Sequence, residues 1–353
     1  MRVVASLDEL LGSVARLVTD GVTPACQVAV ARDGTVLASE TFGAARPTTR
    51  FAAYSATKPI VASAVWLLIG DGRLDPARPV AELVPELATA MPTVTLEQVM
   101  LHTSGFPNAP MTAVEGADAE RRRARFAEWT LEWEPGTRFE YHATSAHWVL
   151  ADLVERVTGD DFRDVVERDV CAPLGLPRVL GIPPADQHDI APGVPSGDLS
   201  AAPVVIDPTA LDRPDVRAAG VPGGGAIMTA ADLARFYQAL LTDRIGLWDA
   251  AVLADAKTNV RCSLPDPLLG VPANRTLGLV LAGDDGLHQM RYAMFGAGCS
   301  PGSFGHAGAY GQVGWADPAT GTSFAFLKNG LAADMVGDAV HLIPIVDLAA
   351  ALD

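Results

Sequence analysis

Cysteine is scarce in this chain of 353 residues, which contains four cysteines: Cys26, Cys171, Cys262 and Cys299. They lie far apart in the sequence and form no CxxC pair, so neither a dense disulfide framework nor zinc-ligand spacing is indicated. The sequence also lacks an HExxH motif, and His142 and His147 stand five apart, off one helical face. We therefore expect free thiols and no metal site.

Positive charge is also in short supply. The chain has 26 Lys and Arg against 42 Asp and Glu, a formal net charge of -16 and a pI near 4.8. Such a charge repels phosphate backbones and anionic lipid heads, which argues against nucleic acid or a membrane surface as a partner. The one basic cluster, Arg121-Arg122-Arg123-Ala124-Arg125, is interpreted as a solvated helix face and not as a docking patch.

Long apolar runs are absent as well. The longest, Pro59 to Ile69, is too short to span a bilayer. Residues 1–17 carry Asp8 and Glu9 within an amphipathic helical pattern, where a secretory signal would need an unbroken apolar region. These features predict a cytoplasmic protein with no membrane association.

What is present is the composition of a loop-rich globular protein. Hydrophobic residues make up 49% and charged residues 19%, with 33 glycines and 26 prolines spread along the chain. A length of 353 residues exceeds one ordinary compact core, so we expect two domains or one domain with a large insertion.

The pattern of elements predicts an α+β fold. Strands are expected at both ends of the chain, 26–31 and 35–41 around an Arg32-Asp33-Gly34 hairpin, then 312–316 and 323–327. Helices are expected at 6–19, from Ser55 to Gly70, and at 145–157, 229–241 and 334–352, and the stretch 180–222 is expected to be mostly loop.

This order suggests one antiparallel sheet built from both termini. We assign residues 1–75 and 286–353 to a discontinuous sheet domain flanked by helices, and residues 76–285 to an inserted, mostly helical domain. A cleft between sheet and helices is then the expected place for a site.

Ser55 and Lys58 form an SxxK pair, Ser55-Ala56-Thr57-Lys58, at the start of the first long helical pattern. Residues i and i+3 share a helix face, so the hydroxyl and the amine are expected to lie close together. Pro59 places Ser55 at or just before the helix N-terminus, where free amides and the helix dipole stabilise an oxyanion. The same positive end, with burial by neighbouring aromatic residues, favours a neutral Lys58 that accepts the serine proton. By spacing alone, an ordinary helix remains an alternative.

Two further segments carry candidate site residues. In Glu140-Tyr141-His142-Ala143, a phenol hydrogen-bonded to Lys58 could relay the proton from Ser55 to the leaving group, although Tyr141 could also be an ordinary packing residue. In Phe304-Gly305-His306-Ala307-Gly308-Ala309, the glycines permit close approach of a ligand. Here His306 is a candidate donor or proton shuttle, and a merely structural histidine is the alternative.

In this order and at these separations, the three segments resemble those of serine β-lactamases, DD-peptidases and family VIII carboxylesterases. Tyr141 opens the segment that stands for Tyr-x-Asn, and His306-Ala307-Gly308 stands for Lys-Thr-Gly, a variant typical of the esterase and D-peptidase branches. Leu101-His102-Thr103-Ser104-Gly105 and Gly220-Val221-Pro222-Gly223-Gly224-Gly225 resemble flanking signatures, so the similarity runs from about residue 25 to 330.

The resemblance implies the penicillin-recognising fold and an acyl-enzyme mechanism without a cofactor. Ser55 would attack an ester or amide carbonyl, Lys58 and Tyr141 would move protons, and the amides of Ser55 and Ala309 would hold the oxyanion. His306 and Gly308 would lie beside the substrate.

One departure from the family pattern matters. Ala143 occupies the position of the asparagine whose amide grips the substrate's amide carbonyl, and His142 or His147 is a possible replacement. Esters are therefore the expected substrates, small or medium in size. The alternatives are acyl transfer or D-amino-acid peptide and amide hydrolysis on the same acyl-enzyme. A β-lactamase or a non-catalytic binding module is a weaker alternative, and the oligomeric state cannot be read from the sequence.

A competing motif is Gly298-Cys299-Ser300-Pro301-Gly302, which matches the G-x-S-x-G nucleophile elbow and is followed by Asp317 and His341. An elbow needs a hydrophobic strand before it and a helix directly after it. Residues 290–298 make a poor strand, and Pro301 and Gly302 forbid an immediate helix, so a loop is favoured here.

Overall fold

Strands from the two ends of the chain pair in one antiparallel sheet in the computed structural model, which describes residues 4–196, 207 and 209–353. The N-terminal strand β1 (Ala25–Arg32) pairs with the C-terminal strand β9 (Thr322–Lys328), with Val28 opposite Phe326. The strand order is β2-β1-β9-β8-β7-β6, where β2 is Thr35–Gly43, β8 Gln312–Asp317, β7 Phe304–Gly308 and β6 Val280–Leu281. The predicted α+β fold with a sheet drawn from both termini is confirmed.

The hairpin between β1 and β2 closes as its sequence predicts. Arg32 pairs with Thr35, leaving Asp33 and Gly34 as a two-residue turn with φ of 51° and 82°. Positive φ at both turn residues matches the right-handed twist of the flanking strands, which is why Asp-Gly is favoured there.

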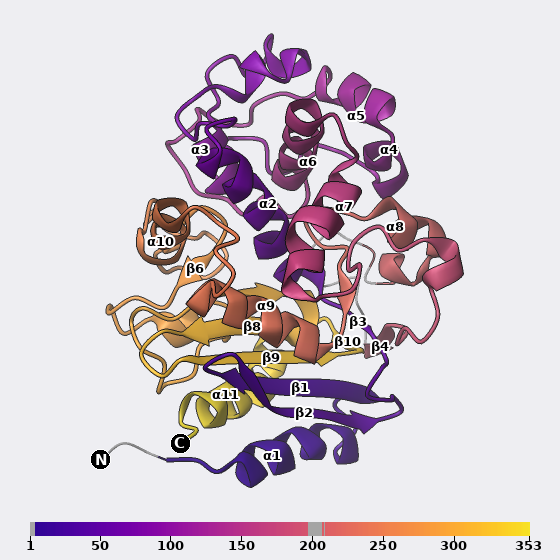
Figure 1. Cartoon of the computed structure of the whole chain (residues 1–353), viewed down its shortest axis with the longest axis vertical. Coiled ribbons are helices and arrows are strands. Elements are labelled where there is room, and N and C mark those ends of the chain that lie inside the picture. The colour runs from indigo at the N-terminus through magenta and orange to yellow at the C-terminus, as the bar shows by residue number, and fades with distance from the viewer. Residues whose placement is uncertain (1–3, 197–206, 208) are drawn as a thin grey trace.

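Helices cover both faces of the sheet (Figure 1). On one face, α1 (Leu7–Thr19) and α11 (Met335–Ala350) pack together, and on the other α9 (Ala230–Thr242) lies against β1, β8 and β9. Alternate residues of β1 therefore enter two different cores, with Val28 and Val30 on the α1 side and Ala25 and Ala29 on the α9 side. Both α1 and α9 begin at a capping box, the latter formed by Thr229 and Asp232 as expected.

The helical part lies beyond α9, at the top of Figure 1, around α2 (Lys58–Gly70) and α6 (Ser145–Thr158), which pack on each other. The other helices are α3 (Leu96–Met100), α4 (Ala113–Ala117), α5 (Ala119–Phe126), α7 (Phe162–Val165), α8 (Pro214–Ala219) and α10 (Ala250–Thr258). Two short sheets complete the fold, one of β3 (Phe51–Ala52) with β5 (Ile227–Met228) and one of β4 (Val194–Ser196) with β10 (Gly330–Ala332).

The predicted boundaries of the inserted domain, 76–285, stay a prediction, but α9 and β6 fall inside that range and pack in the sheet layer. The predicted loop at 180–222 contains β4 and α8, and residues 197–206 and 208 lie outside the described part of the chain.

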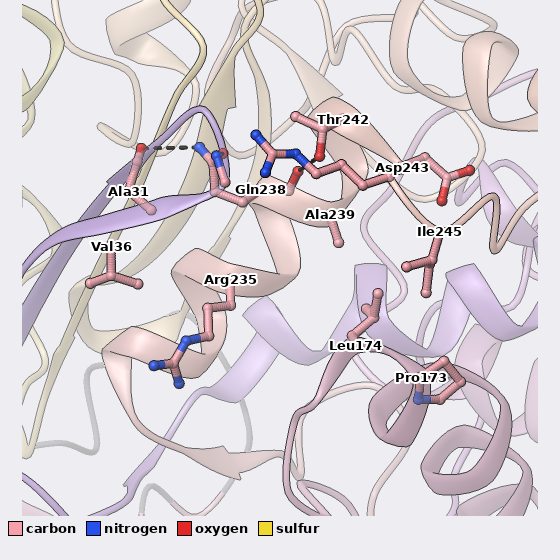
Figure 2. Close-up of a pocket in the computed structure, with 12 residues that line it drawn as sticks. Ala31, Val36, Pro173, Leu174, Arg235, Gln238, Ala239, Thr242, Asp243 and Ile245 are labelled. Atoms are coloured by element: carbon pink, nitrogen blue, oxygen red, sulfur yellow. Dashed lines mark hydrogen bonds between the residues drawn. The ribbon is translucent and has the colours of Figure 1, made fainter.

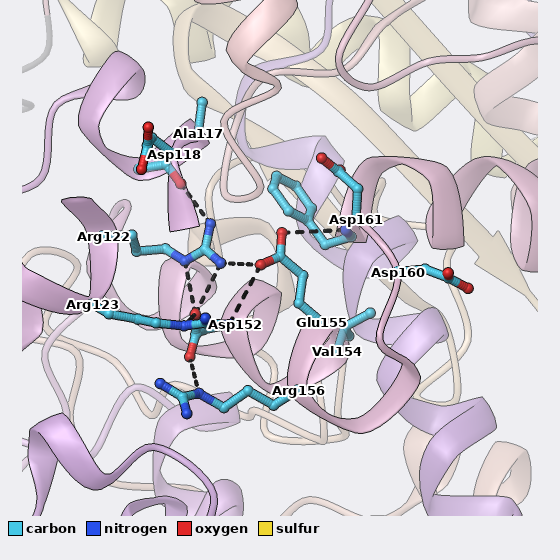
Figure 3. Close-up of polar contacts among 12 residues, drawn as sticks. Ala117, Asp118, Arg122, Arg123, Asp152, Val154, Glu155, Arg156, Asp160 and Asp161 are labelled. Atoms are coloured by element: carbon cyan, nitrogen blue, oxygen red, sulfur yellow. Dashed lines mark hydrogen bonds and ion pairs between the residues drawn. The ribbon is translucent and has the colours of Figure 1, made fainter. Parts of the chain in front are cut away.

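The basic cluster on α5 differs from the prediction. Arg122 is fully buried and its guanidinium donates to Asp152 Oδ1 on α6, 2.9 Å away, and also contacts Glu155 (Figure 3). Arg123 and Arg156 bind the same Asp152 carboxylate. Only part of the cluster is therefore a solvated face, because the buried acids of α6 draw Arg122 into the core, where a charge is tolerated only when paired.

The four cysteines are free, as predicted. Within the described residues, every helix falls short of the length and hydrophobicity that crossing a membrane requires.

Candidate active site

Ser55 lies in a short 3-10 turn, Tyr54–Thr57, between β3 and α2. The α-helix itself begins at Lys58, with Pro59 in its first turn, so Ser55 stands just before the helix N-terminus as Pro59 predicts. Thr57 fastens the turn, since its hydroxyl donates to the Tyr54 carbonyl (2.6 Å) and accepts from the Ala226 amide (3.0 Å). Ser55 is half-buried and Lys58 is buried, so the Ser55 side chain is reachable while that of Lys58 is not.

The side-chain nitrogen of Lys58 lies between two carbonyl groups and the Ser55 hydroxyl. Nζ is 2.7 Å from the carbonyl oxygens of Ala143 and Gly223, and 3.3 Å from Ser55 Oγ. A neutral amine has two N–H donors and one lone pair. The charged form of Lys58 would donate to all three oxygens. In the neutral form the two N–H groups would donate to the carbonyls, and the lone pair would face the Ser55 hydroxyl.

The surroundings of Lys58 favour its neutral form. Burial, and after it the nearby Arg275 guanidinium, hold the pKa of Lys58 well below its ordinary value of 10.5. Gly223 permits this approach, because a side chain there would place its Cβ 3.0 Å from the Ala143 carbonyl and 3.3 Å from Nζ.

Tyr141 lies beside this pair, but not as the sequence suggested. Lys58 Nζ is 4.8 Å from the centre of the Tyr141 ring, over its face, and the buried Tyr141 hydroxyl has no well-formed hydrogen bond to any described residue. The expected Tyr141–Lys58 hydrogen bond is absent because carbonyl groups already occupy the lysine. Burial raises the pKa of Tyr141 to about 12, and Arg275 and the Ser55 side chain oppose this rise.

His306 lies on β7 with both ring nitrogens engaged. Nδ1–H donates to the Ala307 carbonyl (2.6 Å), so Nε2 is the acceptor for Arg275 Nη1 (3.0 Å). Burial, and next Arg275, hold the pKa of His306 well below its ordinary value, which leaves the ring neutral. The expected donor or shuttle is therefore an acceptor, because Arg275 occupies the free nitrogen.

Gly308 brings β7 against the turn that carries Ser55. A Cβ at this position would lie 2.3 Å from the Ala53 carbonyl oxygen, so no other residue fits without moving the strand. Ala309 follows directly, and its amide remains the proposed second donor to an oxyanion.

An aromatic pair flanks Ser55 and the end of β7. The rings of Tyr54 and Tyr310 meet edge to face, with their centres 5.1 Å apart. Tyr54 precedes Ser55 and Tyr310 follows Ala309, and both take positive φ, 45° and 62°. Such backbone strain in bulky residues is typical of functional sites.

The two candidate replacements for the missing asparagine differ. His142 donates through Nδ1 to the Glu140 carbonyl (2.6 Å), and its Nε2 accepts from the Phe106 amide (3.1 Å), so this ring holds loops together and has no group left for a substrate. The expectation that His142 binds substrate is corrected accordingly. His147 is buried, and both its nitrogens lack hydrogen-bond partners among the described residues.

Sequence reasoning missed Arg275, Tyr292 and Asp266. Arg275 is 2% exposed, and its Nη2 donates to the Tyr292 hydroxyl (3.2 Å), which donates to Asp266 Oδ2 (2.8 Å). One signal was available, since Arg275 is the sole charged residue between Asp266 and Asp284.

The competing elbow motif does not assemble a triad in the described residues. Ser300 Oγ donates to Asp317 Oδ1 (2.5 Å), and the same carboxylate accepts the Ala319 amide, as in a turn. His341 is exposed on α11 and has no recorded contact with either residue.

A surface hollow is lined by the β1–β2 turn, the C-terminal part of α9 and Leu174 (Figure 2). Gln238 crosses it to donate to the Ala31 carbonyl (3.0 Å), and none of its lining residues belongs to the predicted site.

The chain is similar to known proteins in both sequence and fold. A family model described as Beta-lactamase matches residues 13–344. The chain is 28% identical over 319 residues to Esterase/beta-lactamase LipL of Mycobacterium tuberculosis, covering 80% of this chain and 70% of that protein. It is 30% identical over 258 residues to Esterase EstB of Burkholderia gladioli, covering 60% and 64%. A solved family VIII carboxylesterase has a similar fold, with a TM-score of 0.81 at 24% identity over 97% of this chain and 98% of that one.

Proposed function

Because the chain belongs to the Beta-lactamase family of serine hydrolases, we propose that it is a carboxylesterase that acts through an acyl-enzyme on Ser55. The observation that carries this proposal is the placement of Lys58 Nζ, 3.3 Å from Ser55 Oγ and 2.7 Å from the Ala143 and Gly223 carbonyl oxygens.

In the proposed reaction, Lys58 takes the hydroxyl proton as Ser55 Oγ attacks the ester carbonyl. The amides of Ser55 and Ala309 hold the oxyanion. The proton then passes to the departing alcohol, with Tyr141 beside the path, and water releases the acyl group as an acid by the reverse sequence. No metal or cofactor enters this scheme.

Three features support a small or medium ester as substrate. Ala143 offers a substrate no side-chain amide, which amide and β-lactam substrates would use. The Tyr54 and Tyr310 rings stand 5.1 Å apart next to Ser55 and Ala309, which narrows the approach. The relative EstB is named as an esterase, and LipL is named as an esterase and β-lactamase.

The test is intact-mass spectrometry after incubation with p-nitrophenyl butyrate, a β-lactam and a D-alanyl peptide. We expect the butyrate ester to give a burst of p-nitrophenol and a transient butyryl adduct, located on Ser55 by peptide mapping. Ser55→Ala should abolish both, and Ser300→Ala, the serine of the competing motif, should retain both.

An adduct on Ser300, or turnover that survives Ser55→Ala, would overturn the proposal. Transfer of the butyryl group from Ser55 to an added alcohol, in preference to water, would instead identify an acyltransferase. Stable acylation without release would identify a binding module.

A further inference from the structure

Arg275 is a buried cation in this site without an acidic partner in direct contact. It is 2% exposed, and among the described residues no carboxylate lies within ion-pairing distance of its guanidinium, whose Nε also lacks a hydrogen-bond partner. Backbone pairing with Cys262 and Val280 holds its main chain in place. An unpaired buried charge is costly, so its retention calls for a compensating role.

The contacts of Arg275 are with the site itself. Nη1 lies 3.0 Å from His306 Nε2, and the guanidinium carbon lies 5.2 Å from the centre of the Tyr141 ring. Tyr292 and Phe139 complete an aromatic box at 5.5 and 5.6 Å. Cations are attracted to such ring faces, which offsets part of the desolvation cost.

A carboxylate is linked to Arg275 indirectly, through the hydroxyl of Tyr292. Asp266, 2% exposed, accepts from the Tyr292 hydroxyl that in turn accepts from Arg275. The positive charge therefore stays partly uncompensated on the side of His306, Tyr141 and Lys58.

We propose that Arg275 is a positioning residue that supplies the site with the positive charge which the Lys-Thr-Gly form of the β7 motif carries on its own lysine. In this chain the motif residue is His306, which is neutral and accepts a hydrogen bond from Arg275. The positive charge therefore lies behind His306, on Arg275, and acts on the site through the imidazole ring.

The electrostatics of the surrounding groups agree with this role. After burial, Arg275 is the next cause that lowers the pKa of Lys58 and of His306, and it opposes the rise of the Tyr141 pKa. Burial is the main cause that lowers the pKa of His102 and His147, and Arg275 adds to it. These two rings stack on each other, and the centre of the His102 ring lies 4.8 Å from that of Tyr141. The charge of Arg275 thus favours a neutral Lys58 base and an ionisable Tyr141.

This inference rests on the proposed esterase function, and its test is the pH profile of kcat/KM for p-nitrophenyl butyrate. Arg275→Gln should lower kcat roughly tenfold or more. It should also move both the acid and the alkaline limb upward by about one pH unit, because the pKa values of Lys58 and Tyr141 both rise when the positive charge is lost. Arg275→Lys should keep the limbs near those of the parent. Arg163→Gln is the matched control, a largely buried arginine that binds Asp161 and the Ala219 carbonyl in the helical part, and it should shift neither limb.

Two further variants test the idea without relying on Arg275→Gln alone. Asp266→Asn removes the counter-charge and should move both limbs downward. The double variant Arg275→Gln with His306→Lys, which restores the family lysine, should return the limbs toward the parent.

The proposal would be overturned if the limbs of the pH profile stayed in place in Arg275→Gln. If that variant does not fold, limbs that stay in place in Asp266→Asn would overturn it. Failure of the esterase function itself would show differently, because the parent protein would then give no acyl adduct on Ser55 at any pH.

Discussion

The side-chain nitrogen of Lys58 is bound by the main-chain carbonyl of Ala143, 2.7 Å away, at the position where the family pattern has an asparagine. The lysine is thus oriented by the backbone of residue 143, and the side chain there is available for another task. Ala143→Asn would add an amide beside the nucleophile that a substrate amide can use.

We expect Ala143→Asn to raise the ratio of amide or β-lactam turnover to ester turnover by roughly tenfold, the value of one added hydrogen bond. The measurement is kcat/KM for a matched pair of p-nitrophenyl ester and p-nitroanilide. An unchanged ratio would show that residue 143 does not contact the acyl group.

A second prediction concerns the stability cost of Lys58. Its folded-state pKa is depressed, chiefly by burial and next by Arg275. Between that value and 10.5 the unfolded chain binds a proton that the folded chain does not, so stability rises with pH in this window. Lys58→Met, similar in volume and never charged, should therefore be more stable than the parent at pH 7, by about 1 to 4 kcal/mol, and the gain should shrink toward pH 10.

Urea unfolding of both proteins at several pH values measures this difference. A Lys58→Met variant that is less stable than the parent at pH 7 would mean that the lysine contacts outweigh its desolvation. The same variant should lose activity by about 10²- to 10⁴-fold, the usual contribution of a general base.

Gly308 provides a third prediction. A Cβ there would meet the Ala53 carbonyl at 2.3 Å, so Gly308→Ala must push β7 away from the nucleophile turn. We expect a loss of about 1 to 3 kcal/mol in stability and a fall of about 10²-fold or more in kcat as the Ala309 amide leaves the oxyanion position.

The matched control is Gly12→Ala on α1, where the added methyl would meet only the tip of Arg16 at 3.9 Å. That change should stabilise the helix by up to about 1 kcal/mol and leave kcat as it is. Full activity in Gly308→Ala would contradict the close approach of β7.

The fourth prediction concerns the stability of the protein at acidic pH. Burial is the main cause that lowers the pKa of four histidines, that of His142 to about 4 and those of His102, His147 and His306 well below 6.5. Below pH 6.5 the unfolded chain takes up protons that the folded chain refuses, so stability should fall as pH decreases from 6.5 toward 4. The slope should reach several times the value for one proton, about 1.4 kcal/mol per pH unit.

Chemical denaturation from pH 7 to 4.5 measures that slope. His147→Gln should reduce it by about one proton, and His188→Gln, at an exposed position, should leave it unchanged. Equal slopes for His147→Gln and the parent would show that the folded protein protonates His147.

Much of the fold was readable from local signals. The Asp33-Gly34 turn, the Thr229–Asp232 capping box and the SxxK helix start each depend on a few neighbouring residues, and each forms as expected. Short strands were harder. β3 and β6 have two residues each and exist only because distant segments pair with them.

The burial of charge was not readable in the same way. Arg122 belongs to a run of charged residues that is typical of a solvated helix face. It is buried because Asp152 of α6 lies within hydrogen-bond distance of its guanidinium in the folded protein. The engagement of His142 Nε2 likewise depends on the amide of Phe106, 36 residues away, whereas Nδ1 donates to the nearby Glu140 carbonyl.

The sequence by itself determined which groups meet at the nucleophile, because Ser55 and Lys58 are one helical turn apart and their geometry is local. Only the tertiary structure decided how they are tuned. The carbonyls that orient Lys58 belong to Ala143 and Gly223, which lie 85 and 165 positions further along the chain. The Arg275 charge acts from a segment more than 200 positions away. Desolvation and electrostatic fields depend on distance in space, and no spacing along the chain encodes them.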